Sequence, residues 1–260
     1  MQNKPEKVNI IFLHGAGQNK TIWQDIIDLL PKDKYNAKAI DLIGFGKRKF
    51  TGQLNLEIWA EDVEKYITKY FKNPPIIVGL SLGSYIILEI LRRNNIKLKK
   101  VILIGALFNG KFAKSYWKKI VYFAVNHPFG ERFIDLICNS KFLVNDLADF
   151  IVHPEIIFKS NDLDRNDYHF TFNSKIINKD NLLATAQGLQ ATFRANYAGF
   201  LKHNKQSIVV LIGDHEIVIS PIYAKKWQKF PHVKLKILPN CGHNTIITKQ
   251  AQVVVKEIIK

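Results

Sequence analysis

Gly79-Leu80-Ser81-Leu82-Gly83 is the stretch that decides the fold, because of what lies on either side of it. Residues 76–80 form a short apolar run, typical of a strand buried on both faces of a sheet. Residues 84–91 begin a helix that closes at 92–95. A serine between two glycines, placed between a strand and a helix, indicates a sharp turn that exposes the serine hydroxyl. The stretch therefore predicts a reactive serine at the carboxyl edge of a sheet.

Strand and helix patterns alternate on both sides of this turn. Apolar runs predict strands at 8–13, 37–42, 100–107, 207–212 and 233–238. Apolar residues at helical spacing predict helices at 21–30, 56–71, 221–230 and 245–259. Continuous apolar strands separated by helices favour a mostly parallel sheet flanked by helices. The expected fold class is therefore α/β.

Residues 109–206 interrupt this alternation. They are rich in aromatic and helical segments and contain no convincing run of buried strands. Such a length exceeds any ordinary connection between a strand and a helix. We therefore expect one core domain made of residues 1–108 and 207–260, with a mostly helical cap insertion at 109–206.

Composition narrows the class of protein. The 260 residues are 47% hydrophobic, which is ample for a buried core, and carry a formal net charge of +16. The lysines are spread along the chain without a dense basic block in a nucleic-acid motif, so we expect no nucleic-acid partner. Residues 1–7 lack the apolar segment of a signal peptide, and no apolar run reaches membrane-spanning length. Two cysteines, Cys138 and Cys241, are most simply two reduced thiols in a cytoplasmic protein.

A second chemical signal follows the last predicted strand. His243 lies on a loop between that strand and the final helix, and therefore at the same sheet edge as Ser81. A serine hydroxyl is a poor nucleophile until a neighbouring imidazole accepts its proton. A carboxylate must then hold the imidazole in the correct tautomer, and the loop after residues 207–212 offers Asp214 and Glu216. The order serine, acid, histidine is the one used by hydrolases with this serine turn.

The loop after the first strand completes the chemistry. It reads His14-Gly15-Ala16-Gly17, a glycine-rich turn that exposes backbone amides. Acyl transfer develops negative charge on the carbonyl oxygen, and two N–H groups aimed at it are worth about 3–4 kcal/mol each. The amide of Leu82, after the serine, and most simply that of Ala16 are the expected donors.

Together these motifs resemble the α/β-hydrolase superfamily, in the branch of small esterases, lysophospholipases, monoglyceride lipases and carbon–carbon bond hydrolases. The residues that carry the resemblance are His14-Gly15, Trp23, Asp41-x-x-Gly44-x-Gly46, Gly79-x-Ser81-x-Gly83, Gly213-x-x-Glu216 and Gly242-His243. The family usually places an aspartate three residues after the glycine of the acid loop, and Glu216 takes that place here. The resemblance therefore favours Glu216 over Asp214 as the acid. It covers the core but not residues 109–206.

The resemblance implies a serine hydrolase that cleaves a carboxylic ester through an acyl-enzyme, with lipid esters and thioesters among the candidates. The catalytic residues would be Ser81, Glu216 and His243, with Ala16 and Leu82 contacting the substrate oxygen. Carbon–carbon bond hydrolysis or acyl transfer by the same residues, and a ligand-binding protein without turnover, remain alternatives. No zinc-ligand spacing or phosphate-binding glycine loop appears, so no metal or cofactor is expected.

The insertion bears on the substrate. Its aromatic residues, with Phe108 just before it, would wall an apolar pocket suited to a hydrophobic acyl group; the residues concerned include Phe108, Phe112, Trp117, Phe123 and Phe129. Residues 111–125 are basic and aromatic, so this helix either contacts acyl chains or an anionic membrane surface, or simply packs on the sheet domain. Packing is the simpler interpretation. The oligomeric state has no signature in the sequence.

Overall fold

The computed structural model describes residues 6–50, 52–112, 129, 179–216, 219 and 221–260. At its centre lies a six-stranded sheet in the order β2-β1-β3-β4-β5-β6, with every neighbouring pair parallel. The strands are β1 (Val8–Leu13), β2 (Tyr35–Ile40), β3 (Ile76–Leu80), β4 (Lys100–Ile104), β5 (Ile208–Gly213) and β6 (Val233–Leu238). The predicted α/β class and parallel sheet are confirmed. Because the strands are parallel, the loops that follow them share one edge of the sheet.

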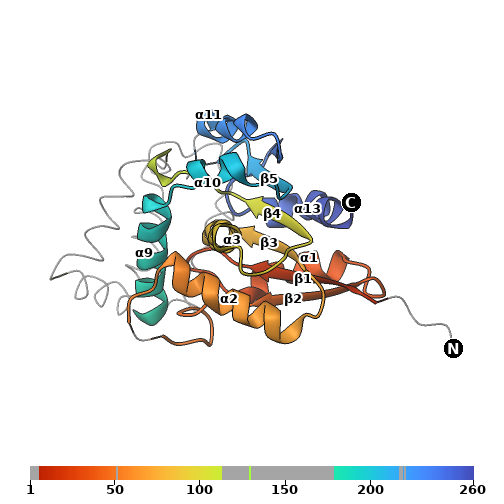
Figure 1. Cartoon of the computed structure of the whole chain (residues 1–260), viewed down its shortest axis with the longest axis horizontal. Helices are drawn as coiled ribbons and strands as arrows, with labels where there is room; N and C mark the ends of the chain where they lie inside the picture. Colours follow the sequence, from red (N-terminus) through yellow and green to blue (C-terminus); the bar gives the residue numbers. More distant parts are fainter. Residues whose placement is uncertain (1–5, 51, 113–128, 130–178, 217–218, 220) are drawn as a thin grey trace.

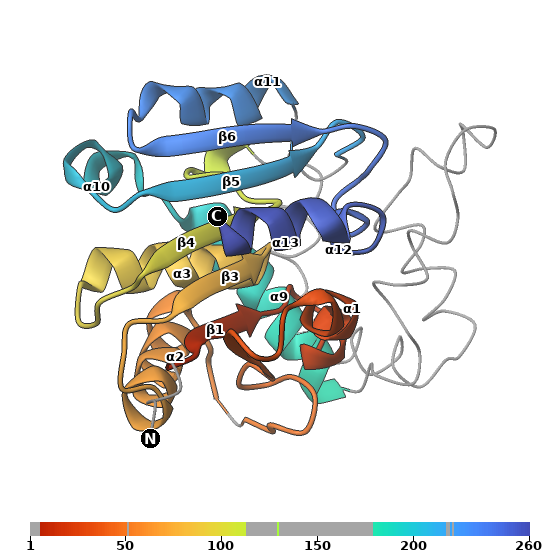
Figure 2. The ribbon, with the colours of Figure 1, turned by 90° about the vertical axis from the view of Figure 1, so that its right-hand side faces the viewer.

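Helices cover both faces of this sheet, as Figures 1 and 2 show. The first half of the chain supplies the 3₁₀ helix η1 (Lys20–Trp23), α1 (Gln24–Leu29), α2 (Leu56–Tyr70), α3 (Leu82–Arg93) and η2 (Gly110–Phe112). The second half supplies α9 (Lys179–Arg194), α10 (Ala198–His203), α11 (Pro221–Ala224), η3 (Lys225–Lys229), α12 (Ile246–Lys249) and α13 (Ala251–Ile259). None of the helices in the described part of the chain is both long and apolar enough to cross a membrane.

Successive side chains along each strand point to opposite faces of the sheet and so divide the core into two layers. Ile11, Ile77 and Val101 face one side, where α2, α3, α10 and η3 cover them. Ile10 and Val78 face the other side, beneath α1, α12 and α13. Side chains on successive strand residues point to opposite faces, so strands apolar throughout require two such layers.

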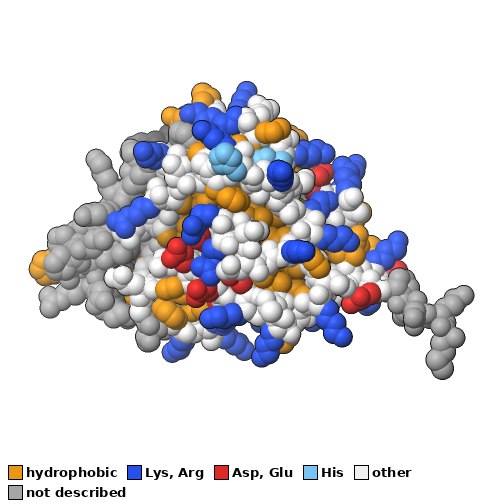
Figure 3. Space-filling view, viewed as in Figure 1, with side chains coloured by type: hydrophobic (Ala, Val, Ile, Leu, Met, Phe, Trp, Pro, Cys, Tyr) orange, Lys and Arg blue, Asp and Glu red, His pale blue; other side chains and the backbone are white. Residues whose placement is uncertain are grey.

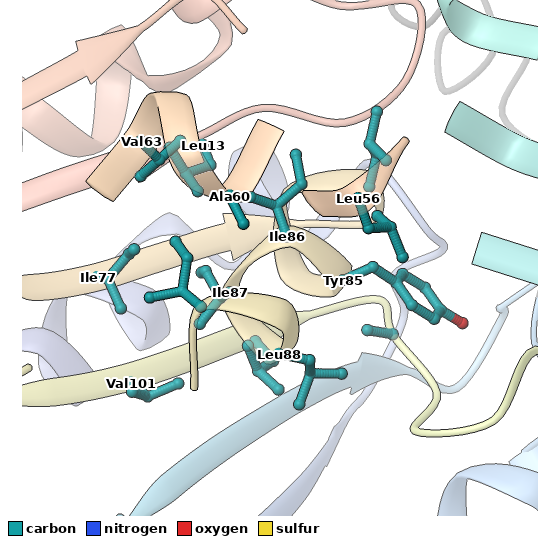
Figure 4. Close-up of a cluster of buried hydrophobic side chains, with 14 of the residues drawn as sticks. Leu13, Leu56, Ala60, Val63, Ile77, Tyr85, Ile86, Ile87, Leu88 and Val101 are labelled. Atoms are coloured by element: carbon teal, nitrogen blue, oxygen red, sulfur yellow. The ribbon is translucent and has the colours of Figure 1, made fainter. Parts of the chain in front are cut away.

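The layer under α2 and α3 is a cluster of buried hydrophobic side chains (Figure 4). Val63 of α2 and Ile87 of α3 are both fully buried against the sheet. Full burial of an aliphatic side chain of this size stabilises the fold by about 1.5–3 kcal/mol. Asn55 caps α2, because its side chain accepts a hydrogen bond from the amide of Ile58 at 2.9 Å. This packing fixes α3, whose first turn carries the serine.

Several predicted boundaries shift in the structure. The strand expected at 100–107 ends at Ile104, because Gly105 has a φ of 59° and turns the chain away from the sheet. The helix expected at 245–259 is broken at Gln250 into α12 and α13, and the helix expected at 221–230 is divided between α11 and η3. The second strand begins at Tyr35 and ends at Ile40, two residues earlier at each end than the predicted 37–42.

The face of the molecule seen in Figure 3 carries its positive charge without concentrating it. Figure 3 shows Lys and Arg side chains spread over the visible face and interspersed with apolar and uncharged groups. The division into a core of residues 1–108 and 207–260 and a cap at 109–206 stays a prediction, since most of the cap lies outside the described residues. Its described part contains η2, α9 and α10, all helical.

Candidate active site

Ser81 occupies the turn between β3 and α3 in a strained backbone conformation, with φ 49° and ψ −112°. Such conformations cost on the order of 1–3 kcal/mol and persist only where neighbours enforce them. Here the Ser81 amide donates to the carbonyl oxygen of Ile104 at 2.8 Å, and the Ser81 carbonyl accepts from the amide of Ser84 at 2.9 Å. The side chain of this residue is therefore fixed at the carboxyl edge of the sheet, at the amino terminus of α3.

The two glycines of the turn permit close backbone packing. A β-carbon on Gly79 would lie 2.5 Å from the carbonyl carbon of Gly83. A β-carbon on Gly83 would lie 2.4 Å from the carbonyl oxygen of Leu13, at the end of β1. Both approaches are too short for any side chain, so the spacing of glycine around Ser81 follows from contact between backbones.

Ser84 supports this turn and was not singled out from the sequence. It is fully buried, donates its hydroxyl to the carbonyl oxygen of Gly79 at 2.6 Å and accepts from the amide of Ile104 at 3.0 Å. It thereby joins the ends of β3 and β4 below the turn. The only sequence signal was its place one residue after the glycine of the motif.

The loop after β1 lies beside the serine. A β-carbon on Gly15 would be 3.4 Å from the β-carbon of Ser81. The Gly15 amide donates to Oε1 of Gln18 at 2.9 Å and is therefore occupied. The amides of Ala16 and Leu82 make no hydrogen bond to another described residue, which leaves both N–H groups available to an incoming oxygen atom.

His14 has a structural role in this loop. Its Nδ1 donates to the carbonyl oxygen of Gly15 at 2.8 Å, and its Nε2 accepts from the amide of Leu42 at 3.1 Å. Complete burial lowers the pKa of His14 to about 4, so the ring is neutral at pH 7. The edge of the ring packs against Phe45 with the centroids 5.2 Å apart. His14 thus holds the loop after β1 against the loop after β2.

His243 and Glu216 form a buried pair on the loops after β6 and β5. Nδ1 of His243 lies 2.9 Å and 2.8 Å from the two carboxylate oxygens of Glu216. The exposed fraction is 8% for the His243 side chain and 0% for that of Glu216. A carboxylate at Nδ1 favours the tautomer that carries its proton there, which leaves Nε2 with its lone pair free to accept a proton.

Gly105 places this imidazole next to the serine turn. A β-carbon on Gly105 would lie 2.9 Å from Cε1 and 3.0 Å from Nδ1 of His243, so the ring packs directly on this glycine. The preceding residue, Ile104, accepts the hydrogen bond from the Ser81 amide. The His243 ring and the Ser81 amide therefore contact two adjacent residues, Gly105 and Ile104, at the end of β4.

Asp214, the other carboxylate considered, has a different position. It is exposed, and its Oδ1 accepts from the amide of Cys241 at 3.4 Å. Its own amide donates to the carbonyl oxygen of Leu238 at 2.9 Å. Asp214 thus joins the loops after β5 and β6, while Glu216 is the carboxylate in contact with His243.

Helix α9 covers the serine turn. A β-carbon on Gly188 would lie 2.8 Å from Cδ2 of Leu82, the residue after the serine, and 3.3 Å from the ring of Trp59. Gln187 accepts a hydrogen bond from the amide of Leu54 at 3.0 Å. The described end of the predicted cap therefore packs closely on the core beside the candidate site.

The aromatic residues predicted to line a substrate pocket occupy different environments in the structure. Phe108 is 1% exposed and packs edge-on against Trp227 and Phe230, with both pairs of centroids 5.1 Å apart. Its ring packs in the core layer under α2 and α3, and its assignment to a pocket wall stays a prediction. Phe129 is 58% exposed. Trp117, Phe123 and most of the basic segment 111–125 lie outside the described residues, as does the side chain of Phe112.

No group of three or more His, Cys, Asp or Glu residues that could hold a metal ion occurs among the described residues. Cys241 is buried, and its Sγ lies 3.5 Å from the carbonyl oxygen of Leu238. The other predicted thiol, Cys138, lies outside the described residues.

Residues 8–250 match the family model described as the alpha/beta hydrolase fold. The chain belongs to this family. A solved structure of MenH from S. aureus superposes with a TM-score of 0.75 at 19% identity, covering 98% of this chain and 93% of that one. At this identity the likeness shows the fold alone.

Two curated relatives bear on activity. A putative 2-succinyl-6-hydroxy-2,4-cyclohexadiene-1-carboxylate synthase of Haemophilus influenzae is 41% identical over 105 residues, which are 38% of this chain and 41% of the relative. A pimeloyl-[acyl-carrier protein] methyl ester esterase of Aromatoleum aromaticum is 19% identical over 264 residues and 99% of both chains. For three of the curated relatives, the Haemophilus protein included, the match spans only 41–61% of their own length.

Proposed function

We propose that this protein is a serine hydrolase that cleaves a carboxylic ester through an acyl-enzyme. The observation that carries the proposal is the contact of both Glu216 oxygens with Nδ1 of His243, on a ring that packs on Gly105, the residue after the one that accepts from the Ser81 amide. A nucleophile, a base and a group that orients the base are the parts that covalent acyl transfer requires. The strained conformation of Ser81 adds support, because strain of this kind concentrates at reactive sites.

In this mechanism the Oγ of Ser81 attacks the ester carbonyl carbon while Nε2 of His243 accepts the hydroxyl proton. Glu216 stabilises the imidazolium that forms. The carbonyl oxygen becomes an oxyanion, held by the amides of Ala16 and Leu82. The imidazolium then donates its proton to the departing alcohol, and the acyl-enzyme remains.

Water completes the cycle. Nε2 of His243 accepts a proton from a water molecule that attacks the acyl carbon, and the second oxyanion occupies the same two amides. Its collapse releases the carboxylic acid and returns the proton to Ser81. Removal of one amide donor from such a site typically costs about 100- to 1,000-fold in turnover.

The substrate in this proposal is a small molecule with an apolar acyl group. The methyl ester esterase that aligns over 99% of this chain supports ester chemistry. The residues around the turn support an apolar acyl group, because Leu82 and Trp59 are fully buried and Gly188 of α9 packs against both. Lipid esters and thioesters both meet this description.

A second candidate is a reaction of the same residues that does not consume an ester. The observation that favours it is the 41% identity over 105 residues to a relative named as a synthase. In such a reaction His243 would still act as the base beside Ser81. The two candidates differ in ester turnover but share an activated serine.

Labelling with a fluorophosphonate probe tests the proposal. Wild type should label at one site, Ser81→Ala should lose labelling completely, and His243→Ala should slow it at least about 1,000-fold. Ser207→Ala is the matched control, because Ser207 is an exposed serine before β5 and should not affect labelling. Hydrolysis of p-nitrophenyl esters of increasing chain length then measures the acyl preference.

Each outcome separates the candidates. Labelling together with ester turnover supports the hydrolase. Labelling without turnover of any ester favours the second candidate. A folded wild-type protein that is not labelled contradicts both reactions and favours a ligand-binding protein built on a hydrolase fold.

A further inference from the structure

Gln18 is a buried amide with a partner at each end. Its exposed fraction is 3%, its Oε1 accepts from the amide of Gly15 at 2.9 Å, and its Nε2 donates to Oδ1 of Asn244 at 3.2 Å. The backbone N–H of Gly15 can only donate, so it fixes which end of the Gln18 side chain is oxygen. The nitrogen end is thereby directed at Asn244.

This side chain connects two loops that the sheet does not hold together. Gly15 follows β1 and Asn244 follows β6, and three other strands lie between β1 and β6 in the sheet. The two residues joined by the Gln18–Asn244 bond are 226 positions apart in the chain. Each bonded residue is the neighbour of a residue in the proposed mechanism: Gly15 precedes Ala16, and Asn244 follows His243.

We infer that Gln18 is a positioning residue that sets the placement of the Ala16 amide relative to the imidazole of His243. The inference rests on the proposed function, in which these two groups act on the same tetrahedral intermediate. Ala16 binds its oxyanion while His243 moves the proton of Ser81 or of the leaving group. A displacement of about 1 Å between such groups can cost about 100-fold in rate. A rigid link between their loops would prevent such a displacement.

Gln18 also decides which amide of the loop after β1 is available. Because its Oε1 occupies the N–H of Gly15, the next amide, that of Ala16, is the one left without a described partner. A β-carbon on Gly15 would lie 2.7 Å from this oxygen, so any larger residue at position 15 would displace the Gln18 amide. Loss of Gln18 would leave both amides competing for the oxyanion and neither correctly placed.

The test compares Gln18→Met, which keeps the length of the side chain and removes both hydrogen bonds, with wild type. We expect kcat for a p-nitrophenyl ester to fall about 10- to 100-fold while KM changes less than about threefold. The rate of fluorophosphonate labelling should fall in parallel. Asn204→Ala is the matched control, since Asn204 also bonds through both ends of its amide, to Gln206 before β5 at the opposite edge of the sheet. It should change neither parameter more than about twofold.

Two further variants keep the inference testable if Gln18→Met folds poorly. Gln18→Glu retains the oxygen that accepts from Gly15 and places a negative charge near the developing oxyanion, so kcat should fall. Gln18→Met combined with Asn244→Leu should be no slower than the slower single variant, because both changes break one link. Wild-type kcat in a folded Gln18 variant, or additive effects in the double variant, would overturn the inference.

A measurement without turnover separates this inference from the proposed function. In NMR spectra, Gln18→Met should shift the Ala16 amide and the His243 ring resonances together, and Asn204→Ala should shift neither. If wild type is not labelled by the phosphonate but these shifts occur, the link stands and the hydrolase proposal fails. If wild type is labelled and the His243 ring does not respond to Gln18→Met, the link fails and the hydrolase proposal stands.

Discussion

Both carboxylate oxygens of Glu216 lie within 2.9 Å of Nδ1 of His243, so the glutamate can hold this nitrogen in its protonated form. Glu216→Gln keeps the size of the side chain, but its amide can donate to Nδ1 and so favour the wrong tautomer. We expect the fluorophosphonate labelling rate to fall about 1,000- to 10,000-fold while the fold is retained.

The control for this prediction is Asp214→Asn, on the exposed carboxylate of the same loop. It should alter the labelling rate less than about threefold, because Asp214 contacts the Cys241 amide and not His243. A loss in Asp214→Asn equal to that in Glu216→Gln would assign the acid role to Asp214 instead.

Gly105→Ala should disable His243 without unfolding the protein. The added methyl group would lie 2.9 Å from Cε1 of the ring, and the φ of 59° at this position is unfavourable for alanine. We expect labelling to slow at least about tenfold, with a loss of about 1–3 kcal/mol in the free energy of unfolding.

Gly199→Ala is its matched control, because a β-carbon there would meet nothing within 4 Å. Gly199 lies in α10, where alanine is favoured over glycine by about 0.5–1 kcal/mol, so this variant should be slightly more stable and label normally. Normal labelling in Gly105→Ala would mean that the ring of His243 does not depend on contact with residue 105.

The parts of the site visible in the sequence are those with a local pattern. The turn at Ser81 joins neighbouring elements, so its glycine spacing and its flanking strand and helix stand together in the chain. His243 was placed by its position after the last strand. The family resemblance favoured Glu216 over Asp214, but the contact of Glu216 with His243 is visible only in the structure, because two carboxylates on one loop differ in which way the backbone points them.

The parts that the sequence did not reveal depend on contacts between distant residues. Gln18 donates a hydrogen bond to Asn244, which lies 226 positions away in the chain. Gly105 matters to the site only because the His243 ring packs on it. The packing of Phe108 on Trp227 and Phe230 was hidden for the same reason, since an aromatic residue in a core and one in a pocket wall have the same local pattern.

Acid should destabilise the protein through His14. The pKa of this ring is about 6.5 in the unfolded chain and about 4 in the buried, folded state. Above pH 6.5 the ring is neutral in both states and has no effect. As the pH falls from 6.5 to 4, His14 binds a proton in the unfolded state but stays neutral in the folded state. The free energy of unfolding should therefore fall by up to about 3 kcal/mol.

Urea unfolding at pH 7 and pH 4 measures this loss in wild type and in His14→Gln, which cannot titrate. His14→Gln should be less stable at pH 7 and should lose less stability on acidification. Ile26→Val, on the buried face of α1, is the control, because it lowers stability without removing a titrating group and should keep the wild-type dependence on pH. An unchanged pH dependence in His14→Gln would contradict the assignment.

Ser84→Ala should weaken the base of the serine turn. It removes the acceptor of the Ile104 amide and the donor to the Gly79 carbonyl, both at a fully buried position. Loss of such partners without water to replace them costs about 1–3 kcal/mol in the free energy of unfolding, which urea unfolding would measure. Thr68→Ala is the matched control, because that exposed hydroxyl donates to the carbonyl oxygen of Glu64 on α2 and should contribute less than about 0.5 kcal/mol. Equal stability of the two variants would mean that the strained turn at Ser81 is held by α3 and the Ser81–Ile104 hydrogen bond alone.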